Sequence, residues 1–151
     1  MHLALADAAA TEAAGASLAK VFPTEDCVIY LHGDLGAGKT TLVRGLLRAL
    51  GHTGRVPSPT YTLVEPYELG RLSLKHLDLY RIADPEELAY LGMRDMAGAL
   101  LIEWPERGTH FLPEPDLECR LTVAPPGRIL EVEGKSGLGQ GLLAAWEGRS
   151  S

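Results

Sequence analysis

The chain has 151 residues, of which 46% are hydrophobic and 23% are charged, so it suits a folded domain and not a disordered segment. Its net charge of −6 argues against a protein whose main task is to hold a nucleic-acid backbone, because such domains are usually basic. No stretch approaches the roughly eighteen apolar residues of a membrane helix, and the alanine-rich start lacks the basic residues of an export signal, so we predict a cytoplasmic protein.

The first third of the chain contains two predicted helices with a short strand between them. Residues 7–20 are an alanine-rich helix with spaced polar positions, and this helix ends before Pro23. Residues 27–32, CVIYLH, form an apolar run with β-branched and aromatic side chains, which favours a buried strand. In residues 39–51 leucine and valine recur every three or four positions, which predicts a helix that ends at Gly51.

The rest of the chain is richer in strands. Alternation of apolar and polar side chains predicts the strands, while proline and glycine mark the loops between them. In chain order the elements are a proline-containing loop (55–60) that becomes strand-like from Tyr61, a strand (72–81), a short helix capped by Asp84 (83–92), an apolar strand (98–106) and a hairpin (117–134) around Pro-Pro-Gly.

These elements predict an α/β fold with a mixed central sheet, flanking helices and a C-terminal β-hairpin. We expect one domain in residues 1–134, followed by a tail in 135–151 whose helical pattern is weakened by its glycines. Cys27 and Cys119 are far apart, and the chain has no CxxC pair. Both are therefore expected to be buried, reduced thiols and not zinc ligands.

Between the first strand and the second helix, residues 33–40 read GDLGAGKT, which fits the phosphate-binding pattern G-x-x-x-x-G-K-[ST]. Glycines let successive backbone N–H groups approach an anion, and the following helix presents the positive end of its dipole. We expect Lys39 to reach the β- and γ-phosphates of a nucleoside triphosphate, Thr40 to ligate Mg²⁺ and Thr41 to reach the α-phosphate. The expected fold is thus a single P-loop NTPase domain.

Two acidic residues stand near the ends of apolar strands, where open α/β sheets place their ligands. Asp78 lies in LKHLDLY, on the same strand face as His76 and Tyr80, and Glu103 ends the run ALLIE. Hydrolysis needs a metal-side acid and a group that orients water. Spacing alone leaves open which acid does which, and His76 by itself is more typical of a structural residue.

The segment SPTYTLVEP places Thr60 and Thr62 two residues apart, on one face if the segment is extended. Two hydroxyls on a proline-stiffened loop are typical of switch segments that sense a γ-phosphate. The alternative, a polar loop that leads into a strand, stays open at this point.

Five blocks, in this order and spacing, extend the similarity beyond a general nucleotide fold: GDLGAGKTT, SPTYTLVEPY, HLDLYR, DPEEL with YLG and RD, and IEWPERG. Together they resemble the TsaE (YjeE) family of small ATPases in bacterial tRNA threonylcarbamoyladenosine biosynthesis, over roughly residues 11–133. The resemblance implies slow ATP hydrolysis coupled to two partners, the TsaD-type threonylcarbamoyl transferase and its inactive TsaB-type paralogue. These partners modify adenosine 37 of tRNA, so this chain is expected to meet tRNA only indirectly and to need no membrane.

The resemblance also implies roles for individual residues. Thr40 and Glu103 are expected to hold Mg²⁺, and Asp78 is expected to be the activity-critical strand aspartate, so the catalytic set is Lys39, Asp78 and Glu103. Thr11 and Arg128 match residues that contact the nucleotide. The family's phosphate loop falls on Gly36, Ala37, Gly38, Lys39, Thr40 and Thr41.

Three other functions are compatible with a phosphate loop. A small-molecule kinase needs an arginine-bearing lid, but the arginines at 71, 81, 94 and 107 are scattered, and a GTP switch needs an N-K-x-D segment that the chain lacks. A non-enzymatic adaptor would only need bound nucleotide in order to dock onto a partner.

The resemblance also places Trp104 near the nucleotide, with a position in the core as the alternative. We favour a Mg²⁺-dependent ATPase.

Overall fold

A single mixed sheet organises the chain. In the computed structural model, which describes residues 1–150, the seven strands lie in the order β1-β7-β6-β2-β5-β4-β3. The strands are β1 (His2–Leu5), β2 (Cys27–His32), β3 (Val64–Leu69), β4 (Leu72–Asp78), β5 (Ala99–Glu103), β6 (Leu117–Ala124) and β7 (Gly127–Gly134). The helices are α1 (Ala8–Ala19), α2 (Lys39–Ala49) and α3 (Gly137–Ser150), with short 3₁₀ segments η1 (Pro85–Leu91), η2 (Met93–Asp95) and η3 (Pro105–Gly108).

The centre of the sheet is parallel and its edges are antiparallel. Strands β6, β2, β5 and β4 run parallel, while β7 and β1 on one side and β3 on the other pair antiparallel. The carboxyl ends of the parallel strands therefore meet at one edge, which is where α/β sheets bind ligands. The predicted α/β class with a mixed sheet and a C-terminal hairpin is confirmed.

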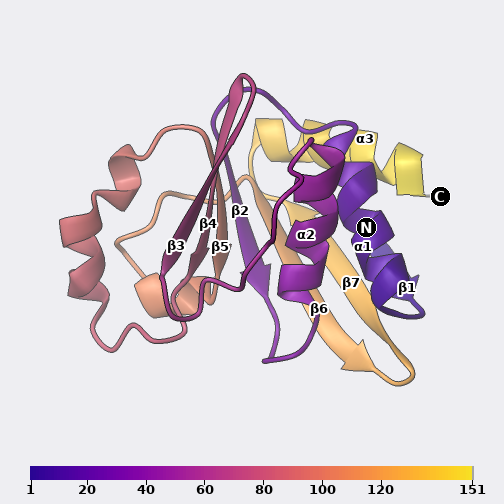
Figure 1. Cartoon of the computed structure of the whole chain (residues 1–151), viewed down its shortest axis with the longest axis horizontal. Helices are drawn as coiled ribbons and strands as arrows, with labels where there is room; N and C mark the ends of the chain where they lie inside the picture. The colour runs from indigo at the N-terminus through magenta and orange to yellow at the C-terminus, as the bar shows by residue number, and fades with distance from the viewer. Residues whose placement is uncertain (151) are drawn as a thin grey trace.

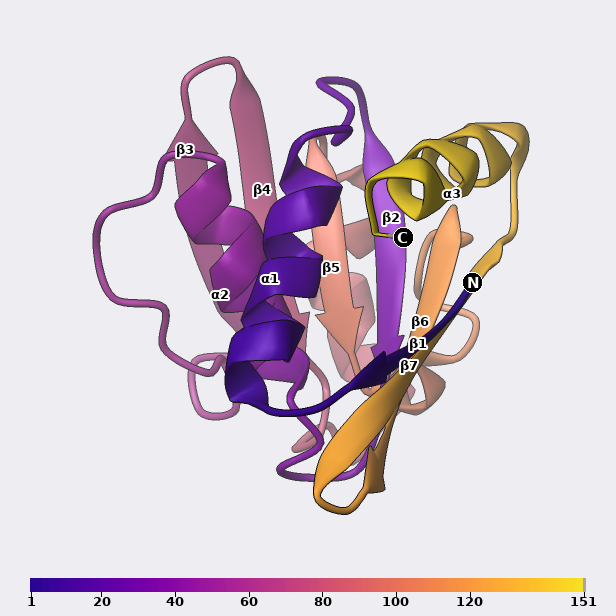
Figure 2. The ribbon, with the colours of Figure 1, turned by 90° about the vertical axis from the view of Figure 1, so that its right-hand side faces the viewer.

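Helices α1, α2 and α3 cover one face of the sheet, and the 3₁₀ segments lie on the other side (Figure 1, Figure 2). Buried apolar residues accordingly form two clusters, one for each face. Helices α1 and α2 approach closely at Gly45, because glycine has no side chain and any Cβ there would collide with the carbonyl oxygen of Glu12. This contact fixes the axis of α2, and hence the loop that precedes α2.

Several predicted boundaries shift for local reasons. The strand expected over 72–81 ends at Asp78, and the helix expected over 83–92 is the 3₁₀ segment η1, with the Asp84 side chain accepting from Glu86 N as its cap. The strand expected over 98–106 ends at Glu103, because Trp104 adopts a left-handed φ of 56° before Pro105. Strand β1, which pairs with β7, was not predicted.

Residues 135–151 contain α3, and the side chain of Trp146 packs this helix against α1. The Trp146 side chain has 0% exposure, and its indole Nε1 donates to Ala14 O at 3.2 Å and to Ser17 Oγ at 3.0 Å. Trp146 belongs to the same apolar cluster as the α1–α2 face. The division of the chain at Gly134 stays a prediction. Within residues 1–150, no helix combines the length and the apolar character that crossing a bilayer requires.

Candidate functional site

The phosphate loop joins the end of β2 to the start of α2. Gly36 and Gly38 have φ values of 79° and 105°, a region that side chains other than glycine rarely adopt. Gly38 is the N-cap of α2, and no side chain caps its amides. The first N–H groups of the helix therefore have no side-chain acceptor, which is the arrangement that binds anions at helix N-termini.

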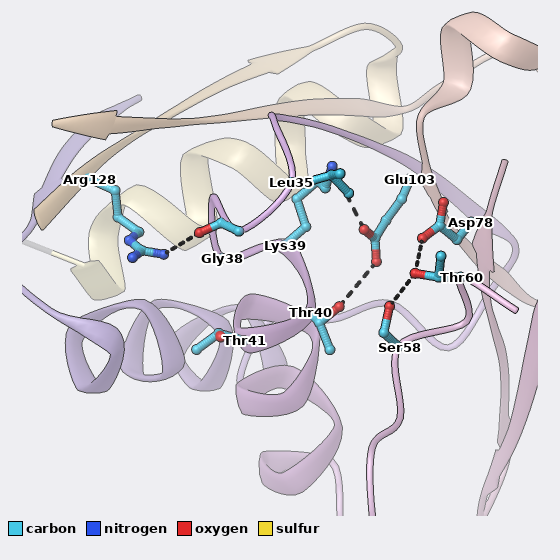
Figure 3. A pocket seen from close by; sticks show the side chains of 11 residues that line it. Leu35, Gly38, Lys39, Thr40, Thr41, Ser58, Thr60, Asp78, Glu103 and Arg128 are labelled. Atoms are coloured by element: carbon cyan, nitrogen blue, oxygen red, sulfur yellow. Dashed lines mark hydrogen bonds and ion pairs between the residues drawn. The ribbon is translucent and has the colours of Figure 1, made fainter. Parts of the chain in front are cut away.

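A cavity of about 200 Å³ opens in front of this loop. Figure 3 shows Thr40, Thr60, Asp78 and Glu103 gathered on one side of it and Arg128 at the other end. The residues that line the cavity are Leu35, Gly36, Gly38, Lys39, Thr40, Thr41, Ser58, Thr60, Asp78, Glu103 and Arg128. The phosphate loop, the segment that carries Thr60 and both strand-end acids therefore face the same cavity.

Lys39 is the buried cation of the site, with 5% exposure. Its ammonium group donates to Gly33 O, lies 3.9 Å from Glu103 Oε1 and lies 4.3 Å from the centroid of the Trp104 ring. Burial lowers the pKa of Lys39 from its usual value, and the nearby carboxylates of Glu103 and Asp78 oppose that shift. The ammonium is held at the cavity wall, within reach of a bound anion.

The register of two strands brings the acids together. Strands β4 and β5 are parallel, and their pairing places Asp78 beside Glu103. Both side chains are nearly buried, at 2% and 3% exposure. The Oε2 atom of Glu103 is 3.5 Å from Thr40 Oγ1, so the acid that ends β5 meets the first turn of α2.

Asp78 is oriented by the loop before β3. Thr60 Oγ1 donates to Asp78 Oδ2 at 3.0 Å, and Ser58 Oγ lies 2.8 Å from Thr60 Oγ1. The other carboxylate oxygen, Oδ1, accepts from the backbone N–H of Tyr80 at 2.9 Å. Each oxygen keeps a lone pair for a further donor, so the carboxylate is fixed in place but can still bind water.

Arg128 reaches the loop from the start of β7. Its Nη1 donates to Gly36 O at 3.4 Å, and a Cβ at Gly38 would lie 2.7 Å from the same nitrogen. The guanidinium therefore packs over the glycine loop, where its charge faces the cavity. Thr41, in the first turn of α2, also lines the cavity.

Four other expected positions lie outside the cavity lining. Thr11 is fully buried in α1, and its hydroxyl donates to Asp7 O at 3.2 Å. Ala37 is buried among core side chains. Thr62 is not aligned with Thr60, because Leu63 N bonds Pro59 O and closes a turn; Thr62 donates to Glu65 instead. Trp104 packs beside Lys39 and Tyr80.

Two contacts in and beside the cavity were not predicted from the sequence. Ser58 lines the cavity and bonds Thr60, although its segment was singled out only for the threonines. His76 is fully buried, and its Nε2 lies 2.6 Å from Glu103 Oε2. The sequence did place His76 on the same strand face as Asp78. It could not show that His76 would meet Glu103, because that contact depends on the pairing of β4 with β5.

The donor set of this wall fits Mg²⁺. Mg²⁺ prefers hard oxygen ligands at about 2.0–2.1 Å, so two oxygens on one ion lie about 3–4 Å apart. The Thr40 hydroxyl and the Glu103 carboxylate are such donors, and their oxygens are 3.5 Å apart. Thr40 and Glu103 are therefore suited to hold the ion next to the phosphate loop.

Comparison with known proteins decides the family. A sequence model described as "Threonylcarbamoyl adenosine biosynthesis protein TsaE" matches residues 5–129. The chain belongs to the TsaE family. The resemblance seen in the five motif blocks is thereby confirmed, and the match spans the phosphate loop, both acids and Arg128.

Curated members of the TsaE family are similar over most of their length. The chain is 45% identical to a tRNA threonylcarbamoyladenosine biosynthesis protein TsaE of Haemophilus influenzae, over 85% of this chain and 84% of that protein. A Synechocystis protein of the same name is 46% identical over 71% of each chain. The crystal structure of Bacillus subtilis YdiB superposes with a TM-score of 0.80 at 26% identity, covering 100% of this chain and 96% of that one.

Proposed function

We propose that this member of the TsaE family is a Mg²⁺-dependent ATPase. By hydrolysing ATP it supports threonylcarbamoyl transfer to adenosine 37 of tRNA. One observation carries the proposal: the phosphate loop with Lys39, and the acids Asp78 and Glu103, face the same cavity. A phosphate cradle opposite two strand-end carboxylates provides what phosphoryl transfer to water requires, namely charge stabilisation and a positioned nucleophile.

Binding depends on the loop side of the cavity. The uncapped amides of α2 and the buried ammonium of Lys39 would hold the β- and γ-phosphates. On binding, Lys39 exchanges its contacts with Gly33 O and the Trp104 ring for phosphate oxygens. Thr41 and Arg128 line the cavity and would contact the rest of the nucleotide. Thr11 and Ala37 do not line the cavity, and their contacts with the nucleotide stay predictions.

Hydrolysis depends on the acid side. Thr40 and Glu103 are suited to hold Mg²⁺, which when bound neutralises charge on the phosphate oxygens. Asp78 has both oxygens fixed by Thr60 and Tyr80 N, and it is suited to accept a proton from a water and so orient that water for in-line attack. Lys39 stabilises the charge that develops on the transferred phosphoryl group.

The partners are proposed to be a TsaD-type threonylcarbamoyl transferase and its TsaB-type paralogue, which act with this chain in the cytoplasm. The chain's net charge of −6 supports a division of labour in which the partners hold the tRNA. This division predicts that the isolated chain binds tRNA weakly at physiological salt. Tight binding, measured by filter retention of labelled tRNA, would contradict it.

The proposal is tested by the ATPase rate of the purified chain with and without the transferase pair. We expect ADP to form slowly from ATP without any added phosphoryl acceptor, to require Mg²⁺, and to form faster when both partners are present. A Lys39→Ala variant should lower the stimulated rate about a hundredfold. ADP formation only after a small-molecule acceptor is added would indicate a kinase, and equal competition by GTP would remove the preference for ATP.

A further inference from the structure

We propose that His76 is a positioning residue for Glu103: it fixes the carboxylate in the orientation that meets Thr40 and receives the metal ion. The inference rests on the proposed function, because it gives Glu103 a metal-binding task. His76 does not line the cavity, so the role proposed for it is exerted through Glu103 and not by contact with the nucleotide.

The contact between the two side chains is short and shielded. His76 is 0% exposed and Glu103 is 3% exposed, and His76 Nε2 lies 2.6 Å from Glu103 Oε2. An ionised carboxylate offers only acceptors, so the imidazole N–H donates. A hydrogen bond to a charged acceptor in a buried site is worth more than one at the surface, so it restrains the carboxylate strongly.

The bond constrains one particular oxygen. Glu103 Oε2 is also the atom that approaches Thr40 Oγ1, at 3.5 Å, whereas Oε1 faces Lys39 Nζ at 3.9 Å. Both of these contacts are longer than an ordinary hydrogen bond. The imidazole therefore supplies the only short hydrogen bond that the described residues offer this carboxylate, and without it Glu103 keeps only the longer contacts with Thr40 and Lys39.

The other ring nitrogen supports a dedicated role. His76 Nδ1 is buried and has no hydrogen-bond partner within residues 1–150. A buried ring with one unsatisfied nitrogen is a poor choice for packing alone, because an aliphatic side chain would fill the same strand position at lower cost. The neighbouring buried positions of β4, Leu74 and Leu77, are leucines. The single short bond to Glu103 is what the imidazole adds.

The arrangement follows the general design of metal sites, in which an outer side chain orients the ligand, and loss of the outer partner lowers metal affinity about 10- to 100-fold. The test compares His76→Gln, whose amide reaches as far as Nε2 and can donate, with His76→Leu, which cannot. The measured quantity is the affinity for a non-hydrolysable ATP analogue, by calorimetry, in Mg²⁺ and in EDTA. Thermal unfolding without nucleotide checks that each variant is folded.

We expect His76→Leu to weaken binding of the analogue in Mg²⁺ about tenfold, with an affinity in EDTA close to that of the wild type. His76→Gln should restore most of the loss. In a Glu103→Gln background the His76→Leu change should have no further effect, because residues that act through one another are not additive. If His76→Leu does not fold, His76→Asn replaces it, since its shorter amide cannot reach Glu103.

Three results would overturn the inference. The first is that His76→Leu loses the same affinity in Mg²⁺ and in EDTA, and the second is that His76→Gln is as impaired as His76→Leu. The third is that both variants bind the analogue as tightly as the wild type in Mg²⁺. Each of these leaves the proposed ATPase intact as long as the wild type binds the analogue more tightly in Mg²⁺. A folded wild type that binds the analogue in neither buffer would instead refute the proposed function.

Discussion

The two sides of the cavity are built in different ways. The loop side is built from one continuous segment, residues 33–39, in which glycine conformations and the start of α2 present amides and Lys39 together, and Arg128 packs over this segment. The acid side is assembled from β4, β5, the loop before β3 and Thr40 of α2, which lie far apart in the sequence. The loop side is therefore a local structure, while the acid side exists only when the sheet has formed.

This difference assigns different tasks to the two sides. The loop side binds phosphate through amides and a cation, which needs no metal. The acid side contributes oxygen donors and a base, which act on metal and water. Measurements in Mg²⁺ and in EDTA therefore separate the two sides, and variants of each side should lose different properties.

The largest effect is expected for Lys39→Ala. The Lys39 side chain is 5% exposed, so its removal takes away the buried cation proposed to stabilise the phosphates, and we expect turnover to fall about a hundredfold. Nucleotide affinity should fall in EDTA as well as in Mg²⁺, as measured by calorimetry. Lys20→Ala, at an exposed lysine that follows α1, is the matched control and should behave as wild type. A loss confined to Mg²⁺ would break the division between the sides.

The acid side should show the opposite pattern. We expect Asp78→Asn and Glu103→Gln each to lower turnover at least tenfold, about 1.4 kcal/mol of barrier, while affinity in EDTA changes little. Both substitutions keep the shape and remove the charge. Glu131→Gln, at an exposed position of β7, serves as control for the ATPase assay. Near-normal hydrolysis by the Asp78 variant would remove Asp78 from the mechanism.

A smaller effect is expected from the segment that orients Asp78. Thr60→Val keeps the volume but removes the hydroxyl that donates to Asp78, so we expect turnover to fall about fivefold, as loss of about 1 kcal/mol implies. Thr62→Val is a close control, because that exposed hydroxyl bonds Glu65 and does not line the cavity. Equal effects of the two variants on the steady-state rate would contradict this distinction.

The smallest effect is expected for Arg128→Ala. Its contact with Gly36 O is long, at 3.4 Å, and exposed, so we expect nucleotide affinity to weaken only about twofold to threefold. The loss should appear in EDTA and in Mg²⁺ alike, because Arg128 belongs to the loop side. Titration of a fluorescent nucleotide analogue measures it. A tenfold change seen only in Mg²⁺ would move Arg128 to the acid side.

The same contrast explains how far the sequence predicts the structure. The phosphate loop is predictable because the motif, the strand before it and the helix after it are adjacent in the chain. Asp78 and Glu103 were identified as strand-end acids, but the pairing of β4 with β5 decides that they are neighbours. The bond from His76 to Glu103 depends on the same pairing, so spacing did not reveal it.

Other misses have local causes. Thr60 and Thr62 would share one face if their segment were extended, but a turn closed by the bond from Leu63 N to Pro59 O gives the two hydroxyls different partners. The strand before Trp104 was predicted too long, since apolar periodicity does not show a residue with φ of 56°. Helix α3 was expected to be weak because of its glycines, whereas burial of Trp146 against α1 supplies a tertiary contact that propensity does not include.

The central claim is that both sides of the cavity act on one nucleotide. Calorimetric titration of the folded wild-type chain with a non-hydrolysable ATP analogue, at two temperatures and with and without Mg²⁺, tests this claim most directly. We predict one nucleotide bound per chain in both buffers, with tighter binding when Mg²⁺ is present. Binding that Mg²⁺ leaves unchanged, or no association at either temperature, would contradict the account.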